Sequence, residues 1–483
     1  MIWTASDFIS AVNGVAVGNH NQNAMISGLA IDSRQVKTGD AFIAITGEHH
    51  DGHDFIPSAM TKGAAAILMS ANTDLAELRL SDQVLYVQVD DPMKGLERLA
   101  VAARNRHQGT RIAITGSVGK TGTRMLVAQA LAAYGKTHFS EGNLNNHIGA
   151  PLSLARMPKD AAFGVFEAGM NHAGELTALS QFIAPHIGII TQIADSHSGN
   201  FPNLEAIALA KAEIFDGLVN QEQRLAILNA DDPFAPLLEQ KALDAGAERV
   251  IRFGYSDIAE HQILSVRRQQ DGLAIEANIR GEAHHFKLGM MAPHWAKAAI
   301  IALSVVDALG LPLEPAKAEL AKARDLPGRG ARSVIRLKKG PSEIKITVID
   351  DSYNAGPASM VSALSSLSSD PQKGRRVAIL GDMLELDRAA DKHAALAETV
   401  EASGISHLIT VGEMMQHLNS AISVPSLRCD HAANAKSAFP LVLSALEDGD
   451  LVLIKGSNGM RLSELVHNLS SAIPHTNGDS HAA

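Results

Sequence analysis

The chain has 483 residues, of which 46% are hydrophobic and 19% are charged, and its formal net charge is −10. This length predicts about three domains, and the negative charge argues against nucleic acid as a partner. The single cysteine excludes an internal disulfide and favours a reducing compartment. The longest apolar stretch, near residues 298–309, is interrupted by Asp307 and is too short for a membrane span. We therefore expect a cytoplasmic protein without membrane insertion. We also expect it to act as a monomer, although these features do not bear on the oligomeric state.

Residues 1 to about 107 predict a small α/β domain. Strand-like runs occur at residues 26–31, 41–45 and 64–69, separated by polar segments that include a loop at 47–55. That loop holds three histidines and two aspartates, which would permit a metal site. A polar loop that contacts a ligand or solvent is the better interpretation, because no second ligand cluster has matching spacing.

A phosphate-binding turn begins the next domain, which we place at residues 108–325. The β-branched run 112–115 stops at Gly116, and a helical pattern starts near residue 124. Glycine allows a tight turn and close approach to a ligand, and a helix N-terminus favours anions. In such turns the lysine, here Lys120, reaches the β- and γ-phosphates and the hydroxyl, here Thr121, holds magnesium. The spacing Gly-x-x-Gly-Lys-Thr is shorter than usual, because Ile114 stands where the first glycine is expected.

Polar groups follow four successive predicted strands of this domain. Because open parallel sheets place ligands at the carboxyl ends of their strands, these groups are candidates for binding nucleotide and magnesium. They are the turn after residue 115, Glu167, the segment Asp195-Ser196-His197, and Asn229 with Asp231 and Asp232. A helix predicted over 203–215, with Asn203 as its N-cap, carries Lys211 on an apolar stripe. A lysine there either extends its ammonium to solvent or has a functional partner.

The remainder predicts an antiparallel edge, a linker and a third domain. Residues 249–290 alternate in polarity between glycines and predict short antiparallel strands, and a helix is expected over 294–309. Residues 325–332 break the periodicity and predict a linker. Strands ending near residues 349, 380, 411 and 454 predict a doubly wound, Rossmann-like domain over 326–474. The polar tail 475–483 is expected to be disordered. The predicted fold class is therefore α/β with three domains.

In this order, these segments resemble the Mur ligases, and the likeness covers nearly the whole chain. The shared stretches are Asp32-Ser33-Arg34, Gly39-Asp40-Ala41-Phe42, Asp51-Gly52-His53-Asp54-Phe55, Thr115-Gly116-Ser117-Val118-Gly119-Lys120-Thr121, Asn145-Asn146-His147-Ile148-Gly149-Ala150-Pro151-Leu152, Glu167-Ala168-Gly169-Met170-Asn171, Ala210-Lys211-Ala212-Glu213-Ile214-Phe215, Asp351-Ser352-Tyr353-Asn354-Ala355, Gly381-Asp382-Met383-Leu384-Glu385-Leu386 and Lys455-Gly456-Ser457. The stretches at 167–171 and 381–386 resemble the branch that adds D-alanyl-D-alanine.

The resemblance implies an activity: ATP would phosphorylate the terminal carboxylate of UDP-N-acetylmuramoyl-tripeptide, and the amine of D-alanyl-D-alanine would attack the acyl phosphate. It also implies site residues. Nucleotide binding is implied for Gly116, Ser117, Val118, Gly119, Lys120, Thr121, Gly122, Asn146, Arg329 (or Arg332) and Asp351. Magnesium ligands are implied to be Thr121 and Glu167, with His197 and a carbamoylated Lys211 for a second ion. The catalytic residues are then Lys120, Glu167, His197 and Lys211. The small first domain would bind the uridine nucleotide through Ser33, Arg34, Gly52 and His53.

Two departures from the family pattern concern the adenine region. The usual His-Asn-x-x-Asn reads His294-Trp295-Ala296-Lys297-Ala298, and Gly356 replaces an asparagine before Pro357. These departures leave open an inactive relative that binds the uridine nucleotide as a scaffold or regulator. Independently of them, a related Mur ligase that adds another amino acid also stays open.

Overall fold

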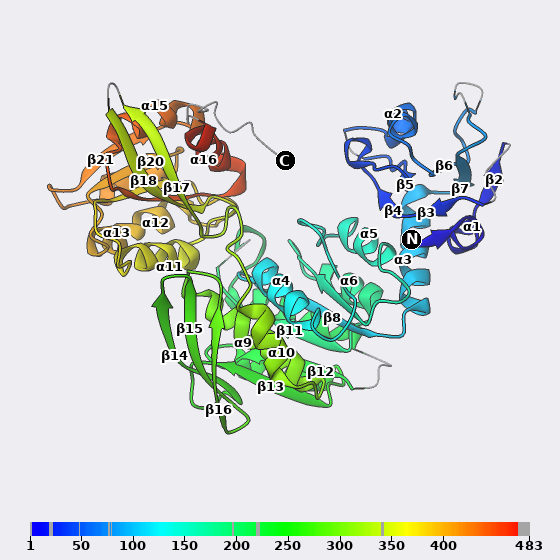
Figure 1. Cartoon of the computed structure of the whole chain (residues 1–483), viewed down its shortest axis with the longest axis horizontal. Coiled ribbons are helices and arrows are strands. Elements are labelled where there is room, and N and C mark those ends of the chain that lie inside the picture. Colours follow the sequence, from blue (N-terminus) through cyan, green and yellow to red (C-terminus); the bar gives the residue numbers. More distant parts are fainter. Residues whose placement is uncertain are drawn as a thin grey trace, which may run out of the picture.

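The computed structural model describes residues 2–18, 23–47, 49–75, 78, 80–195, 198–218, 223–339 and 342–471. It is built on three larger sheets, one in each lobe of Figure 1, and a two-stranded ribbon. The predicted α/β class with three domains is confirmed. The predicted disorder of residues 475–483 falls outside the described residues. Within these residues, no helix is long and apolar enough to cross a membrane.

The N-terminal sheet has five strands in the order β2-β7-β6-β5-β4, and all its pairs are parallel except β2 with β7. Parallel pairing brings the loops after β4 and β5 to one edge of the sheet. The elements are β1 (Trp3–Thr4), α1 (Ala5–Val12), β2 (Val15–Val17), β3 (Met25–Ile26), β4 (Gly28–Ala30), η1 (Ser33–Gln35), β5 (Asp40–Ile43), η2 (Gly52–Phe55), α2 (Ile56–Thr61), β6 (Ala66–Ser70), β7 (Leu85–Val89) and α3 (Pro92–Arg106).

The central sheet has nine strands in the order β16-β15-β14-β13-β12-β11-β8-β10-β9. The strands are β8 (Thr110–Thr115), β9 (Thr137–Phe139), β10 (Phe163–Glu167), β11 (Ile187–Ile190), β12 (Leu225–Asn229), β13 (Arg249–Gly254), β14 (His261–Gln269), β15 (Gly272–Ile279) and β16 (Glu282–Leu288). The helices are α4 (Lys120–Leu131), α5 (Gly149–Ala155), α6 (Glu175–Ile183), η3 (Ser198–Asn200), α7 (Leu204–Ala212), η4 (Glu213–Gly217), α8 (Ala235–Asp244), α9 (Trp295–Ala308) and α10 (Leu313–Leu320).

Strand β8 lies inside the central sheet and is buried on both faces. Ile112 and Ile114 belong to the core shared with α4, α9 and α10, whereas Ala113 belongs to the core shared with α5, α6 and α7. Alternate residues of a strand point to opposite faces, so a continuous apolar run is what a doubly covered strand requires. Because β10 and β11 flank β8 in parallel, their ends lie beside the predicted phosphate turn.

The edge of this sheet differs from the prediction in two ways. Strand β13 pairs in parallel with β12, and β14 begins in parallel with β13, so only β14, β15 and β16 pair antiparallel with one another. Helix α8 precedes β13 and returns the chain to the starting end of the sheet, which makes β13 parallel. The edge strands have seven to nine residues and are therefore not short.

The C-terminal sheet has six strands in the order β17-β18-β22-β19-β20-β21, with only β17 and β18 antiparallel. This is the doubly wound arrangement expected from the sequence. The elements are β17 (Ala331–Lys339), β18 (Ser342–Asp351), α11 (Pro357–Ser368), β19 (Arg376–Gly381), α12 (Ala389–Ala394), α13 (Leu396–Ala402), β20 (His407–Val411), α14 (Met415–Ala421), β21 (Arg428–Ala432), α15 (Ala435–Ala445), β22 (Leu451–Lys455), η5 (Asn458–Met460) and α16 (Leu462–Ser471).

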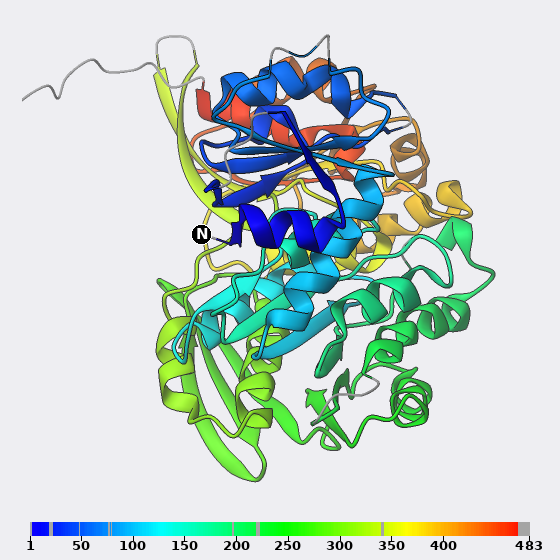
Figure 2. The ribbon, with the colours of Figure 1, turned by 90° about the vertical axis from the view of Figure 1, so that its right-hand side faces the viewer.

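Both outer lobes lie above the central lobe in Figures 1 and 2, and their contacts with it differ in kind. One apolar core runs from the N-terminal lobe through α3 into α5 of the central lobe, and the Trp3 indole donates to the carbonyl of Ala155 at 3.1 Å. The C-terminal lobe keeps cores of its own. It meets the central lobe through ion pairs, among them Lys392 with Asp195 at 2.5 Å and Arg268 with Asp370 at 2.7 Å.

Candidate active site

The turn between β8 and α4 has the backbone of an anion-binding loop. Gly116 has φ +148° and Gly119 has φ +84°, and a Cβ at residue 116 would lie 1.9 Å from the Thr191 hydroxyl. Thr191 follows β11 and donates to the carbonyl of Val118 at 2.6 Å. Helix α4 then begins at Lys120, so its free N–H groups lie at the turn and favour a phosphate.

Lys120 lies over this turn and is half-buried. Its ammonium donates to the carbonyl of Gly116 at 2.7 Å. Burial lowers the pKa of Lys120; the Glu167 carboxylate opposes that shift and the Arg329 guanidinium adds to it. The lysine is therefore close enough to both groups to respond to their charges, in a site that favours an anion.

Glu167, at the end of β10, is a buried carboxylate with both oxygens hydrogen-bonded. The Thr121 hydroxyl donates to Oε2 at 3.0 Å and the Asn145 amide donates to Oε1 at 2.9 Å. The Glu167 side chain is only 2% exposed. A hydroxyl and a carboxylate at one point supply the hard oxygen ligands that magnesium prefers, so these two residues fit the ion.

Lys211 on α7 does not extend to solvent, because it is 1% exposed. No described residue forms a hydrogen bond or ion pair with its ammonium. Burial lowers the pKa of Lys211 well below its usual value, and the Lys120 ammonium lowers it further. Asn203 caps the helix as predicted, accepting from the Ala206 amide at 2.8 Å. His197, the expected ligand beside Lys211, lies outside the described residues.

The two arginines of the linker occupy different places. The Arg329 guanidinium lies 4.0 Å from the centre of the Tyr353 ring and is close enough to Lys120 to lower its pKa. Arg332 instead pairs with Asp370, which also binds Arg268. Of the two arginines, Arg329 is therefore the one whose charge acts on Lys120 at the phosphate turn.

Other predicted nucleotide-binding residues make contacts within the protein. The Asn146 side-chain oxygen accepts from the Gly149 amide at 2.8 Å, at the start of α5. Asp351 pairs with Lys455 at 2.8 Å. At the end of β12, Asp231 pairs with Lys297 at 2.8 Å, and Asp232 accepts from the Ile193 amide at 2.6 Å. Hydrogen bonds and ion pairs thus shape the loop after β12.

The four predicted uridine-binding residues follow β4 and β5 at one edge of the N-terminal sheet. Ser33 is buried, whereas the Arg34 side chain is 87% exposed and is paired with Asp32 at 2.8 Å. Gly52 packs so closely that a Cβ would lie 2.6 Å from the Ile45 carbonyl. Both ring nitrogens of His53 are engaged, by Asp51 and by the Ser70 amide. Arg34 is thus the exposed charge among them.

Comparison with known proteins then identifies the family. Family models match at residues 25–104 (Mur ligase family, catalytic domain), 114–306 (Mur ligase middle domain) and 336–458 (Mur ligase, glutamate ligase domain). The UDP-N-acetylmuramoyl-tripeptide--D-alanyl-D-alanine ligase of Bacillus subtilis is 30% identical over 96% of this chain and 98% of its own length. The chain belongs to the Mur ligase family.

Other relatives support the same assignment. The counterpart of the same name in Escherichia coli is 29% identical over 96% of this chain and 98% of its own length. A crystal structure of MurF from Acinetobacter baumannii superposes with a TM-score of 0.79, at 25% identity, over 98% of this chain and 99% of that one. This Mur ligase therefore matches its relatives over all three lobes.

Two residues of the site were not assigned from the sequence. Asn145 lies in a stretch shared with the Mur ligases, and its side-chain amide donates to Glu167. Arg124, on α4, is 4% exposed and lies 3.9 Å from a Glu167 oxygen. Arg124 lies one helical turn after Lys120 on the same side of the helix, and this spacing could have identified it from the sequence.

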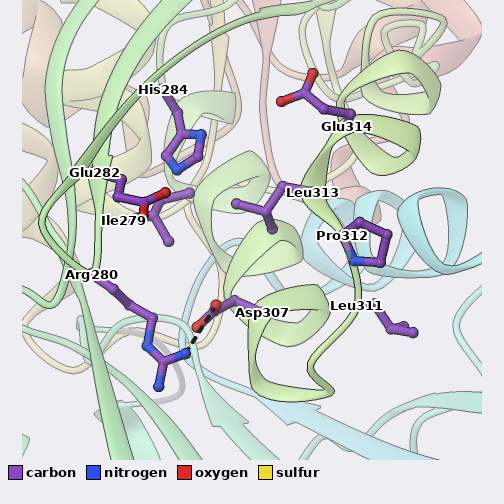
Figure 3. Close-up of a pocket in the computed structure, with 9 residues that line it drawn as sticks. All are labelled: Ile279, Arg280, Glu282, His284, Asp307, Leu311, Pro312, Leu313 and Glu314. Carbon is purple, nitrogen blue, oxygen red and sulfur yellow. Dashed lines mark hydrogen bonds and ion pairs between the residues drawn. The ribbon is translucent and has the colours of Figure 1, made fainter.

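A separate cavity of about 450 Å³ lies away from these residues, beside α10 (Figure 3). None of the predicted site residues lines it. In the view the Arg280 guanidinium points toward Asp307, at 3.5 Å. Among the described residues, no three acidic, histidine or cysteine side chains are grouped to hold a metal ion. The lining is Ile279, Arg280, Glu282, His284, Asp307, Leu311, Pro312, Leu313 and Glu314.

Proposed function

We propose that this Mur ligase uses ATP to join D-alanyl-D-alanine to UDP-N-acetylmuramoyl-tripeptide, in the cytoplasm, giving the UDP-linked pentapeptide precursor of peptidoglycan. The observation that carries the proposal is the meeting of Lys120, Thr121 and Glu167 at the phosphate turn of a chain that matches ligases of this name over its full length.

ATP and magnesium fit the residues present. Backbone N–H groups of the turn 116–122 would bind the phosphates, and Lys120 would leave the Gly116 carbonyl for a phosphate oxygen. Thr121 and Glu167 would hold magnesium. When bound, the ion supplies a positive charge that lets a carboxylate approach the triphosphate.

The proposed reaction has two chemical steps. A carboxylate oxygen of the tripeptide attacks the γ-phosphorus and ADP leaves, which yields an acyl phosphate. The amine of D-alanyl-D-alanine then attacks the acyl carbon, loses a proton, and phosphate leaves as the amide forms. Lys120 and Arg329 would neutralise the phosphate charge, because such transfers depend on positioning and electrostatics.

Lys211 supports a second cation site in a modified form. A buried amine with a lowered pKa is neutral more often, and a neutral amine is the form that adds carbon dioxide. The resulting carbamate would exchange a buried cation for an anionic oxygen ligand. We propose this carbamate and His197 as ligands of a second magnesium ion.

The remaining assignments concern the ends of the two nucleotides. Asp351 would bind the ribose of ATP and Asn146 would position its γ-phosphate. Ser33, Arg34, Gly52 and His53 would bind the uridine nucleotide, with Arg34 as the exposed cation for its diphosphate. We further propose that the chain acts as a monomer, with domains bounded near residues 107 and 325.

The decisive experiment measures phosphate release from ATP with each substrate omitted in turn. We expect release only when UDP-tripeptide and D-alanyl-D-alanine are both present. Release with a single amino acid in place of the dipeptide would indicate a different Mur ligase. Binding of UDP-tripeptide without phosphate release from the complete mixture would instead support the scaffold alternative and contradict the proposal.

A further inference from the structure

Arg124 is a buried cation beside the candidate metal site. It lies on α4, its side chain is 4% exposed, and its Nη1 is 3.9 Å from Glu167 Oε2. That separation is longer than a hydrogen bond. The same nitrogen donates to the carbonyls of Ser140 and of Gly142, the latter at 3.1 Å. The Arg124 guanidinium therefore links α4, the helix that follows the phosphate turn, to the loop after β9.

That loop, residues 140–148, connects β9 with α5, and we call it the β9–α5 loop. It carries Asn145, whose amide donates to Glu167 Oε1 at 2.9 Å and to Asn143 at 2.8 Å. The Gly169 amide donates to the Asn145 carbonyl at 2.8 Å. Asn145 is thus held on Glu167 by a loop whose first residues are bound by Arg124.

Burying a guanidinium costs free energy unless its N–H donors are hydrogen-bonded. Its Nε has no hydrogen-bond partner among the described residues. A leucine or methionine would fill the volume without that cost. The distinctive property of arginine here is that it binds two carbonyls of the loop while placing a positive charge near Glu167.

We propose that Arg124 is a positioning residue: by binding the β9–α5 loop through the Ser140 and Gly142 carbonyls, it keeps the Asn145 amide on Glu167 and so fixes the orientation of that carboxylate for magnesium. The inference rests on the proposed function only in taking Glu167 as a metal ligand. Groups that orient metal ligands typically change metal affinity 10- to 100-fold when removed.

The test measures ADP binding by calorimetry over a range of magnesium concentrations, a readout independent of ligase turnover. We expect Arg124→Met to raise the magnesium concentration for half-maximal binding by about 10-fold or more. ADP affinity without metal should change less than about twofold, because the turn is intact. Arg124→Lys keeps the charge and should recover part of the loss.

Asn145→Ala and Arg111→Met distinguish an effect on the position of Glu167 from a general loss of stability. Asn145→Ala should shift the magnesium dependence in the same direction, and adding it to Arg124→Met should change little, because both act through one contact. Arg111→Met is the matched control: Arg111 is 5% exposed, lies on β8 and donates to the carbonyls of Ile183 and Ala184. We expect it to lower stability to urea without changing the magnesium dependence.

The inference is overturned if Arg124→Met and Arg111→Met both lose stability while the magnesium dependence stays that of the parent. It is also overturned if Arg124→Met shifts that dependence and Asn145→Ala does not. If Arg124→Met fails to fold, the magnesium dependence of Arg124→Lys and of Asn145→Ala still tests the inference. If the parent enzyme instead binds magnesium and ADP but does not use D-alanyl-D-alanine, the proposed function fails and this inference stands.

Discussion

At the scale of single residues, Lys120 is the group on which the chemistry most depends. Its ammonium already lies over the phosphate turn, 2.7 Å from the Gly116 carbonyl. We expect Lys120→Met to lower kcat about 10²- to 10³-fold, the usual effect of losing one group that stabilises transition-state charge. Phosphate release with all substrates measures this. Lys136→Met, at an exposed lysine paired with Asp160, is the control and should keep full activity. A loss below tenfold for Lys120→Met would contradict the assignment.

The buried ammonium of Lys211 should lower the stability of the fold, although the proposed function requires this residue. Its pKa is lower in the folded chain than in the unfolded chain, so the unfolded chain binds more protons between the two values and stability rises with pH there. Lys211→Met removes this cost. We expect it to raise the free energy of unfolding by about 1–4 kcal/mol at pH 7. The gain should disappear as the pH approaches about 10.5, the usual lysine pKa.

Urea unfolding of parent and Lys211→Met across that pH range, in buffers purged of carbon dioxide, measures the effect. Purging keeps the amine unmodified, because a carbamate would change the charge under comparison. The same variant should lack ligase activity. Equal stability of the two proteins at every pH would show that burial of this amine costs the fold nothing.

The sequence could predict the residues at strand ends but not how their side chains pair. Thr121 and Glu167 were placed at strand ends by the sequence and assigned to magnesium through the family resemblance, and the structure shows that they are hydrogen-bonded. Asn145 and Asn146 are adjacent in an irregular loop, where no periodicity says which side chain points inward. The structure places the Asn145 amide on Glu167, while the Asn146 side-chain oxygen accepts from the Gly149 amide at the start of α5.

At the scale of elements, helices α4 and α9 pack through an unusual pair. A Cβ on Gly122 would lie 1.8 Å from the Trp295 ring, so the first turn of α4 and the indole fit only because residue 122 has no side chain. Trp295 lies in the stretch 294–298, where the sequence departs from the pattern expected of the family. The absence of a side chain at residue 122 leaves room for its ring.

This pairing predicts a non-additive response. We expect Gly122→Ala to destabilise the protein by about 1–3 kcal/mol through overpacking, and to weaken nucleotide binding by displacing α4. The double variant Gly122→Ala with Trp295→Leu should recover much of that loss in urea unfolding. Gly47→Ala, where the nearest atom is 3.6 Å from the added carbon, should be nearly neutral. Additive effects in the double variant would exclude a direct clash.

Periodicity predicted the buried strands best and the exposed edges worst. Strands such as β8 are continuous apolar runs, which sequence patterns detect. β9 and β21 are short or half-exposed edge strands, and their mixed residues carry no such pattern. The direction of β13 depended on recognising α8 as a crossover helix rather than on the residues of the strand itself. Polarity alternation at residues 249–290 could not distinguish parallel from antiparallel pairing.

At the scale of the whole molecule, the nature of the two interfaces indicates which lobe moves. An apolar core that continues through α3 and α5 makes the N-terminal and central lobes one body. The C-terminal lobe is held by ion pairs, which can exchange partners with little loss of buried apolar surface. Polar interfaces allow domain motion, and closure around a ligand commonly uses such motion. We therefore expect closure to occur at the linker near residues 325–332.

The two linker arginines provide a matched test of that expectation. Arg329 lies over the Tyr353 ring and its charge lowers the pKa of Lys120, so Arg329→Met should lower kcat about 10²-fold while the small-angle scattering profile stays that of the parent. Arg332 shares the buried Asp370 with Arg268, so Arg332→Met should loosen the junction. It should change the scattering profile without substrates and lower kcat less than about tenfold, because Arg332 is not placed at the turn. If both variants changed activity and scattering alike, the linker would act as one unit and the separate roles would be wrong.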